Sequence, residues 1–144
     1  MDMERLTRRI PILVLLVAVL AACNGSSGEP TATYDGSGCT YDGPNEFDLN
    51  SEVTFTFIDE TESGSAGFAI WPVPAGTTAE QIQEEGIFNV GIDPIPWSSE
   101  TQVSDSEWQG TLTFDQAELH ALNCFDMSGG GEGADYPNLV TVSE

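Results

Sequence analysis

The chain has 144 residues, enough for one small domain. Its 24 acidic residues outnumber 3 cationic ones, for a formal net charge of −21 at pH 7. Every cationic residue lies before position 10, so the rest of the chain has no Lys or Arg and 22 acidic residues. Such a chain repels phosphate backbones, and we expect no nucleic-acid partner. The acids are scattered, which favours adaptation to high salt over a dedicated cation site.

Residues 1–22 are predicted to be a lipoprotein signal peptide. A basic start precedes an apolar run, Ile10 to Leu20, that is too short to span a bilayer. The stretch Leu20-Ala21-Ala22-Cys23 resembles the bacterial lipobox. That resemblance implies lipid attachment at Cys23 and an extracytoplasmic position on a membrane of the cell envelope. The alternative is an ordinary secreted protein cleaved near Ala22.

Residues 23–38 are rich in Gly, Ser and Thr and are predicted to be a flexible tether, with the folded domain spanning 39–144. The two remaining cysteines are Cys39 and Cys124. Because an exported domain meets an oxidising compartment, we expect a disulfide between them. Closing a loop of about 85 residues would stabilise the fold by about 4–5 kcal/mol in the loop-entropy estimate.

The first half of the domain predicts two strands and a short helix. Residues 52–57 alternate strictly, with Val53, Phe55 and Phe57 directed to a buried face. A second strand, 66–71, ends before two prolines. A helix of about two turns follows, with a capping box formed by Thr77 and Glu80.

The second half predicts further strands separated by turns. A proline-containing loop, 91–99, carries Trp97. Residues 108–114 alternate, with Trp108, Leu112 and Phe114 directed inward, and 117–125 form another extended segment. A glycine-rich loop then leads to a last strand, 139–142. Short strands, frequent turns and one short helix predict an all-β, Greek-key β-sandwich.

The segment after Phe114 resembles the end of a cupredoxin, in which a strand carries an aromatic residue and then a cysteine four residues later. Here the matching parts are His120, Cys124, the loop to Asn138 and the strand "LVTV", while "EVTFTFID" resembles an early cupredoxin strand. The resemblance implies a cupredoxin-like sandwich. The stretch Cys39 to Pro44 also resembles the start of small envelope lipoprotein domains.

The copper ligands of that family are not reproduced. A blue-copper site needs two histidines, a thiolate and a weak axial ligand such as Met. The chain has one histidine, His120, which precedes Cys124 instead of lying between Cys124 and Met127. We predict that His120 is a packing or hydrogen-bonding residue and that Cys124 is a disulfide partner. No metal ligand set and no cofactor are therefore predicted.

The chain lacks the Gly-x-Ser-x-Gly motif of serine hydrolases. It also lacks the Asp-rich loop pattern of calcium-binding proteins. We therefore expect no enzyme. Trp108 fits the buried face of its strand, whereas Trp71 falls on the face opposite to Phe68 and Ile70 and Trp97 lies in a loop. We therefore expect Trp71 and Trp97 to be the exposed tryptophans. They are the candidate ligand surface, although they could instead cover the ends of the sandwich. The predicted function is a lipid-anchored envelope protein that binds an unknown protein or small molecule. The alternatives are a carboxylate-based binder of a divalent cation such as calcium and a copper redox protein.

Overall fold

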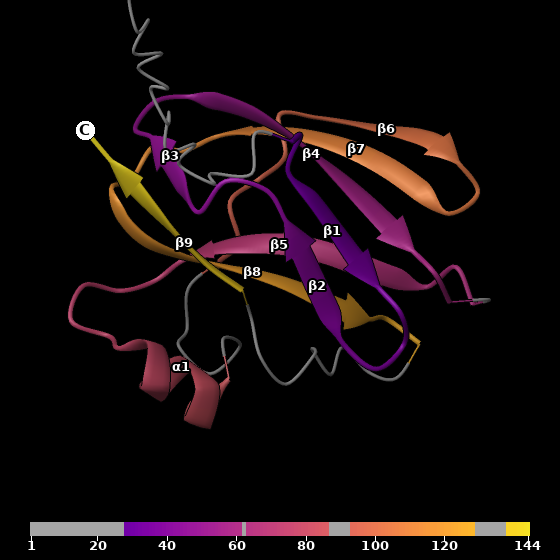
Figure 1. The fold of residues 1–144 in the computed structure, drawn as a ribbon, viewed down its shortest axis with the longest axis horizontal. Coiled ribbons are helices and arrows are strands. Elements are labelled where there is room, and N and C mark those ends of the chain that lie inside the picture. The colour runs from indigo at the N-terminus through magenta and orange to yellow at the C-terminus, as the bar shows by residue number, and fades with distance from the viewer. Residues whose placement is uncertain (1–27, 62, 87–92, 129–137) are drawn as a thin grey trace, which may run out of the picture.

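The computed structural model describes residues 28–61, 63–86, 93–128 and 138–144. This part of the chain forms strands and one short helix, α1, Ala79–Glu85 (Figure 1). The strands are β1 Thr31–Tyr34, β2 Cys39–Asp42, β3 Glu46–Asp48, β4 Glu52–Asp59, β5 Ala66–Pro72, β6 Ser99–Ser104, β7 Glu107–Thr113, β8 Glu118–Asp126 and β9 Asn138–Ser143.

The strands form two sheets. One sheet has the order β2-β1-β4-β7-β6, and the other has the order β3-β9-β8-β5. Pairing is antiparallel except between β1 and β4 and between β3 and β9. The two sheets enclose a shared core of aromatic and aliphatic side chains. The predicted all-β sandwich with one short helix is therefore confirmed.

Strict alternation in the sequence places the core side chains of β4 and β7. Phe55 and Phe57 of β4 are 1% and 7% exposed, and Leu112 of β7 and Phe114 just after it are fully buried. Because alternate residues of a strand project to opposite faces, these side chains meet between the two sheets. The predicted inward faces of both segments are correct.

The N-terminal boundary of the domain differs from the prediction. Strand β1 lies inside the segment 23–38 that was expected to be a tether. It pairs with β2 on one side and with β4 on the other, and Ala32 and Tyr34 are buried in the core. The composition of the segment hid this strand because only two of its side chains contribute apolar area. The folded domain therefore begins before Cys39.

Helix α1 covers the outer face of the four-stranded sheet. Ile82 of the helix is fully buried in a second apolar cluster with Ala69, Trp71 and Ala121. Thr78, instead of the predicted Thr77, is the N-cap, and its capping-box partner is Gln81 instead of Glu80. Gly86 ends the helix as the C-cap. Within the described residues, no helix is long and apolar enough to cross a membrane.

The two sheets are offset from each other. Between the sheets, β1 contacts β8 and β4 contacts the edge strand β5. Because β7 and β6 follow β4 in the five-stranded sheet, they extend past the edge of the four-stranded sheet. Along β7, Leu112 is fully buried in the core, whereas Trp108 is half-buried, and all residues of the edge strand β6 are exposed.

Candidate binding groove

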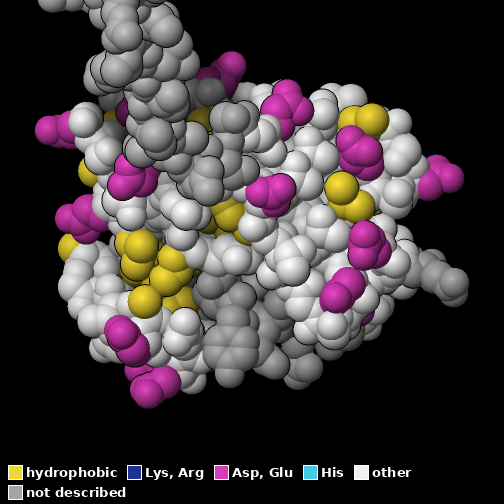
Figure 2. Space-filling model, in the orientation of Figure 1, with side chains coloured by type: hydrophobic (Ala, Val, Ile, Leu, Met, Phe, Trp, Pro, Cys, Tyr) yellow, Lys and Arg dark blue, Asp and Glu magenta, His cyan; other side chains and the backbone are white. Residues whose placement is uncertain are grey.

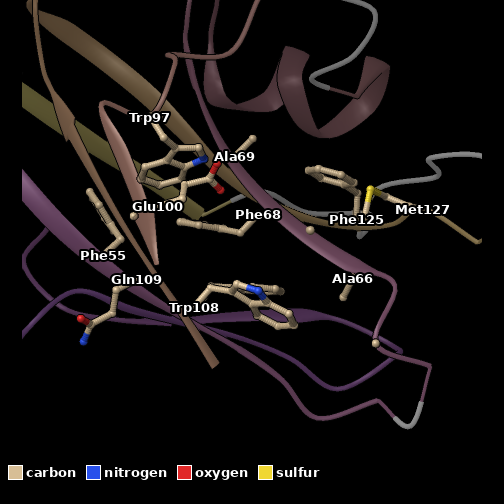
Figure 3. A pocket seen from close by; sticks show the side chains of 14 residues that line it. Phe55, Ala66, Phe68, Ala69, Trp97, Glu100, Trp108, Gln109, Phe125 and Met127 are labelled. Carbon is tan, nitrogen blue, oxygen red and sulfur yellow. The ribbon is translucent and has the colours of Figure 1, made fainter. Parts of the chain in front are cut away.

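A cavity of about 410 Å³ lies on the side of the sandwich where β7 and β6 extend past β5. Residues of β4, β5, β6, β7 and the segment before β6 line this groove, together with side chains at the end of β8 (Figure 3). Its side chains are mainly aromatic: Phe55, Phe57, Phe68, Trp97, Trp108 and Phe125. Apolar cavities of 300–1,000 Å³ with a few polar groups are typical of small-molecule sites.

Three buried phenylalanines form the base of the groove. Phe57 and Phe68 stack at 5.8 Å between ring centroids, and Phe55 lies 6.0 Å from Phe68. Each of the three is at most 8% exposed. Because these rings also belong to the central core, the base is fixed by the packing of the whole sandwich.

Two tryptophans form the walls above this base, and both are half-buried. Trp108 of β7 stacks on Phe57 at 5.9 Å, and Trp97 lies 5.9 Å from Phe68 and 6.2 Å from Phe55. The indole of Trp97 lies against the backbone of Gly110. A methyl group at position 110 would come within 2.7 Å of the indole, so only glycine fits there.

The segment that carries Trp97 connects the two sheets. The Ile95 amide donates to the Ile70 carbonyl of β5 at 2.8 Å, and the Ser98 amide donates to the Thr111 carbonyl of β7 at 2.7 Å. The Ile70 carbonyl must therefore point away from β8. Since peptide groups alternate in direction along an antiparallel strand, the Phe68 peptide groups also point away from β8, toward the groove.

One acidic side chain, Glu100 of β6, also lines the groove and is exposed. Elsewhere the acids are dispersed: Figure 2 shows Asp and Glu side chains spread over the visible face, with no Lys or Arg beside them. Among the described residues, no group of three or more His, Cys, Asp or Glu could hold a metal ion. The structure therefore offers no observation in favour of the calcium alternative.

The two predicted tryptophans have different surroundings. Trp97 lines the groove, as the prediction of a ligand surface requires. Trp71 does not: it is 5% exposed, and it packs against Phe125 at 6.4 Å between ring centroids. Alternation correctly placed Trp71 on the outer face of its sheet, but the second apolar cluster, to which α1 contributes, buries that face. The prediction that Trp71 is exposed is wrong.

Trp108 is one groove residue that sequence reasoning missed. Its predicted inward direction is correct, because it pairs with the core residue Phe57 across β4 and β7. Its burial is only partial: Trp108 packs against the core but is half-buried, and it lines the groove. The alternation of apolar and polar residues along a strand indicates on which face of the sheet a side chain lies. Whether that face is covered depends on the offset between the two sheets.

His120 is fully buried within the sandwich. Its ring meets Phe114 edge to face at 5.1 Å, and Nδ1 lies 3.3 Å from the Glu118 carbonyl. Its Nε2 has no partner among the described residues. Burial lowers the pKa of the imidazole below its ordinary value, although the Glu118 carbonyl and the charge of Asp115 oppose that shift. These contacts agree with the predicted packing and hydrogen-bonding role.

The disulfide between Cys39 and Cys124 is formed, with 5.4 Å between the two Cα atoms. It joins β2 in one sheet to β8 in the other, and Cys124 is fully buried. The Asn138 side chain also donates to the Cys39 carbonyl at 3.1 Å. This pairing confirms the prediction from the two cysteines.

The residues present do not fit a blue-copper site. Its sulfur ligand must be a thiolate, and the Cys124 sulfur is bonded to Cys39. The single histidine of the chain is buried against Phe114, while Met127 is 62% exposed. A second imidazole is absent from the sequence. Cys23 and most of the glycine-rich loop lie outside the described residues.

No family profile matches the chain, and no curated protein matches it. Solved structures of low sequence identity match the chain. Reduced auracyanin from Roseiflexus castenholzii is 17% identical, with a TM-score of 0.41 over 79% of this chain and 95% of that chain. The copper protein rusticyanin is 14% identical, with a TM-score of 0.45 over 81% of this chain and 80% of that one. These likenesses concern the sandwich fold alone, and no conclusion about function follows from them.

Proposed function

We propose that the chain is a binding protein of the cell envelope, without catalytic activity, and that the groove between β5 and β7 is its ligand site. The observation that carries this proposal is the cavity of about 410 Å³ walled by the half-buried Trp97 and Trp108. Its volume and its aromatic lining suit a small organic molecule. The Phe68 peptide groups and Glu100 add polar groups that can orient such a ligand.

The base of the groove is fixed by the packing of the core. Phe55, Phe57 and Phe68 belong to the core, and Trp97 is held against Gly110 by a segment that is hydrogen-bonded to both sheets. A ligand would therefore lose little free energy in ordering the site. Partly exposed indole rings in a fixed position are also typical anchors of binding sites.

Location at a membrane is the second part of the proposal, and it depends on the lipobox resemblance at Cys23. Expressed in a bacterial host, the wild-type protein is expected to carry lipid and partition into detergent, and the C23S variant is expected to lack the lipid and to be either released or stalled with its leader uncleaved. Wild-type protein recovered without lipid would contradict this part of the proposal and leave the groove unaffected.

The neutral compound 4-tert-butylphenol tests the groove. The full chain with C23S is titrated while tryptophan emission and amide chemical shifts are recorded. Binding should perturb the amides of β5 and β7, and Trp97→Ala should weaken it by about tenfold. The control Val103→Ala changes an exposed β6 side chain outside the groove lining and should leave binding unchanged. Perturbations elsewhere, or equal losses in both variants, would contradict the proposed site.

A further inference from the structure

We infer that the ligand is a small organic cation, bound with its positive charge beside Glu100 and its apolar body against Trp97 and Trp108. This inference rests on the proposed function, because it names the ligand class for the same groove. It is carried by the position of one carboxylate beside a groove lining that is mainly aromatic.

The strand register places Glu100 on the groove side of the sheet. Phe55 of β4 is opposite Gly110 of β7, and Gly110 is opposite Glu100 of β6. Residues directly opposite one another on neighbouring strands project from the same face. Phe55 is 1% exposed within the core, so Glu100 shares the inner face of the sheet with it. Its carboxylate therefore borders the groove instead of the outer surface.

Trp97 occupies the position between Phe55 and Glu100. Because its indole lies against Gly110, it fills the space that a side chain at position 110 would take in this row. Figure 3 shows the Trp97 ring and the Glu100 carboxylate together at one end of the groove. The face of an indole attracts a cation, and a neighbouring carboxylate adds to that attraction. An anion would be repelled by both groups.

The part of the chain that the structure describes supplies no Lys or Arg for this site. No Lys or Arg follows Arg9, so no such side chain among the described residues can pair with Glu100. The 22 acidic residues after the first ten positions also raise the local concentration of cations around the domain. A positively charged ligand thus meets favourable charge both at long range and at the groove itself.

The groove favours an organic cation over a metal ion. Calcium and similar hard cations require six to eight oxygen ligands, and among the described residues that line the groove Glu100 is the one carboxylate. The rest of the described lining is mainly aromatic and aliphatic, with Gln109 as a further polar side chain, and the volume of about 410 Å³ far exceeds that of a single ion. A quaternary or alkyl ammonium group attached to an apolar body fits both properties.

An inward-pointing charge on an edge strand can also have a protective role. Such charges oppose the pairing of two sheet edges, and β6 is an edge strand whose residues are all exposed. If this were the whole role of Glu100, its neutralisation would promote dimers and leave ligand choice unchanged. The two explanations therefore predict different measurements.

A matched pair of ligands tests the inference. In (4-hydroxyphenyl)trimethylammonium a charged nitrogen replaces the quaternary carbon of 4-tert-butylphenol, so the two differ mainly in charge. Titrated into the full C23S chain at physiological ionic strength, the cation should bind about tenfold more tightly. Glu100→Gln should reduce this preference by about fivefold. Glu84→Gln, which removes the same charge from the exposed face of α1, should change it by less than about twofold.

Each outcome has a distinct meaning. Failure of both ligands to bind would contradict the proposed function and the inference together. Equal binding of the two ligands would overturn the inference and leave the groove as a binding site. Equal losses in the Glu100→Gln and Glu84→Gln variants would assign the preference to the overall charge and overturn it too. Dimerisation of the Glu100→Gln variant, measured by sedimentation, together with an unchanged preference for the cation would also overturn the inference.

Discussion

The two open sides of this sandwich are closed in different ways. On one side a disulfide joins β2 to β8, and the buried Cys124 anchors it in the core. On the other side no covalent bond joins the sheets. There a short segment makes two backbone hydrogen bonds, one to each sheet, and presses the indole of Trp97 against Gly110. The covalent side contributes stability, whereas the non-covalent side leaves space for a ligand.

The contrast shows how a small domain with unfavourable charge can hold an open groove. A groove reduces the apolar area that the two sheets bury against each other, and the excess of acidic residues adds repulsion. A cross-link on the opposite side compensates by restricting the unfolded chain. The predictions below test this division between the two sides, from the largest expected effect to the smallest.

Opening the covalent side should have the largest effect. Reduction, or the double variant Cys39→Ala with Cys124→Ala, should lower the free energy of unfolding by about 4–5 kcal/mol in the loop-entropy estimate. The melting temperature should fall by more than about 10 °C, measured by circular dichroism. The loss should be more damaging in dilute buffer than in molar salt, where repulsion is screened. An unchanged melting temperature on reduction would show that the cross-link does not carry this stability.

Disturbing the non-covalent side should lower the free energy of unfolding less than loss of the disulfide does, and it should impair the groove more. A methyl group in Gly110→Ala would approach the Trp97 ring within 2.7 Å and displace it. We expect a loss of about 1–3 kcal/mol in unfolding free energy and a red-shifted tryptophan emission. The control Gly38→Ala adds a methyl group with no atom within 4 Å and should leave both unchanged. An unshifted emission in Gly110→Ala would mean that Trp97 does not rest on this glycine.

The smallest effect concerns His120, on the same strand as Cys124. Burial lowers the imidazole pKa below its ordinary value of 6.5, so the unfolded chain binds the proton more readily. Stability from the neutral ring is therefore complete above pH 6.5 and is lost as the pH falls below it. Between pH 7.5 and 5, the wild type should lose unfolding free energy relative to His120→Phe, measured by urea denaturation. Because all carboxylates are common to both proteins, parallel pH profiles would contradict a lowered pKa.

Much of the sandwich could be predicted because the sequences of its central strands alternate between apolar and polar residues, and this alternation indicates which side chains are buried. β4 alternates without interruption, and the cysteine count together with the expectation of export predicted the disulfide correctly. β3 and β6 were not predicted. β3 has three residues with one buried side chain, and all six residues of β6 are exposed, so neither shows an apolar period. Such strands are specified by pairing with neighbours, which a single sequence does not display.

The groove could be predicted only in part, for a related reason. Trp97 was identified because it lies in a loop, but the roles of Trp71 and Trp108 were exchanged. Strand alternation assigns each side chain to a face, and the cover over that face comes from elements distant in sequence. The second apolar cluster buries Trp71, and the offset of the sheets exposes Trp108. Glu100 was missed as well, because its direction follows from the register between β6 and β7.

The early start of β1 limits how far the domain can stand from a membrane. If Cys23 carries a lipid, the chain reaches the first paired residue, Thr31, after eight residue steps. A fully extended chain covers at most about 28 Å over that distance. Anionic headgroups would repel the acidic domain over roughly one Debye length, about 8 Å at physiological ionic strength. A domain anchored in this way would then be held in a thin layer just outside the bilayer.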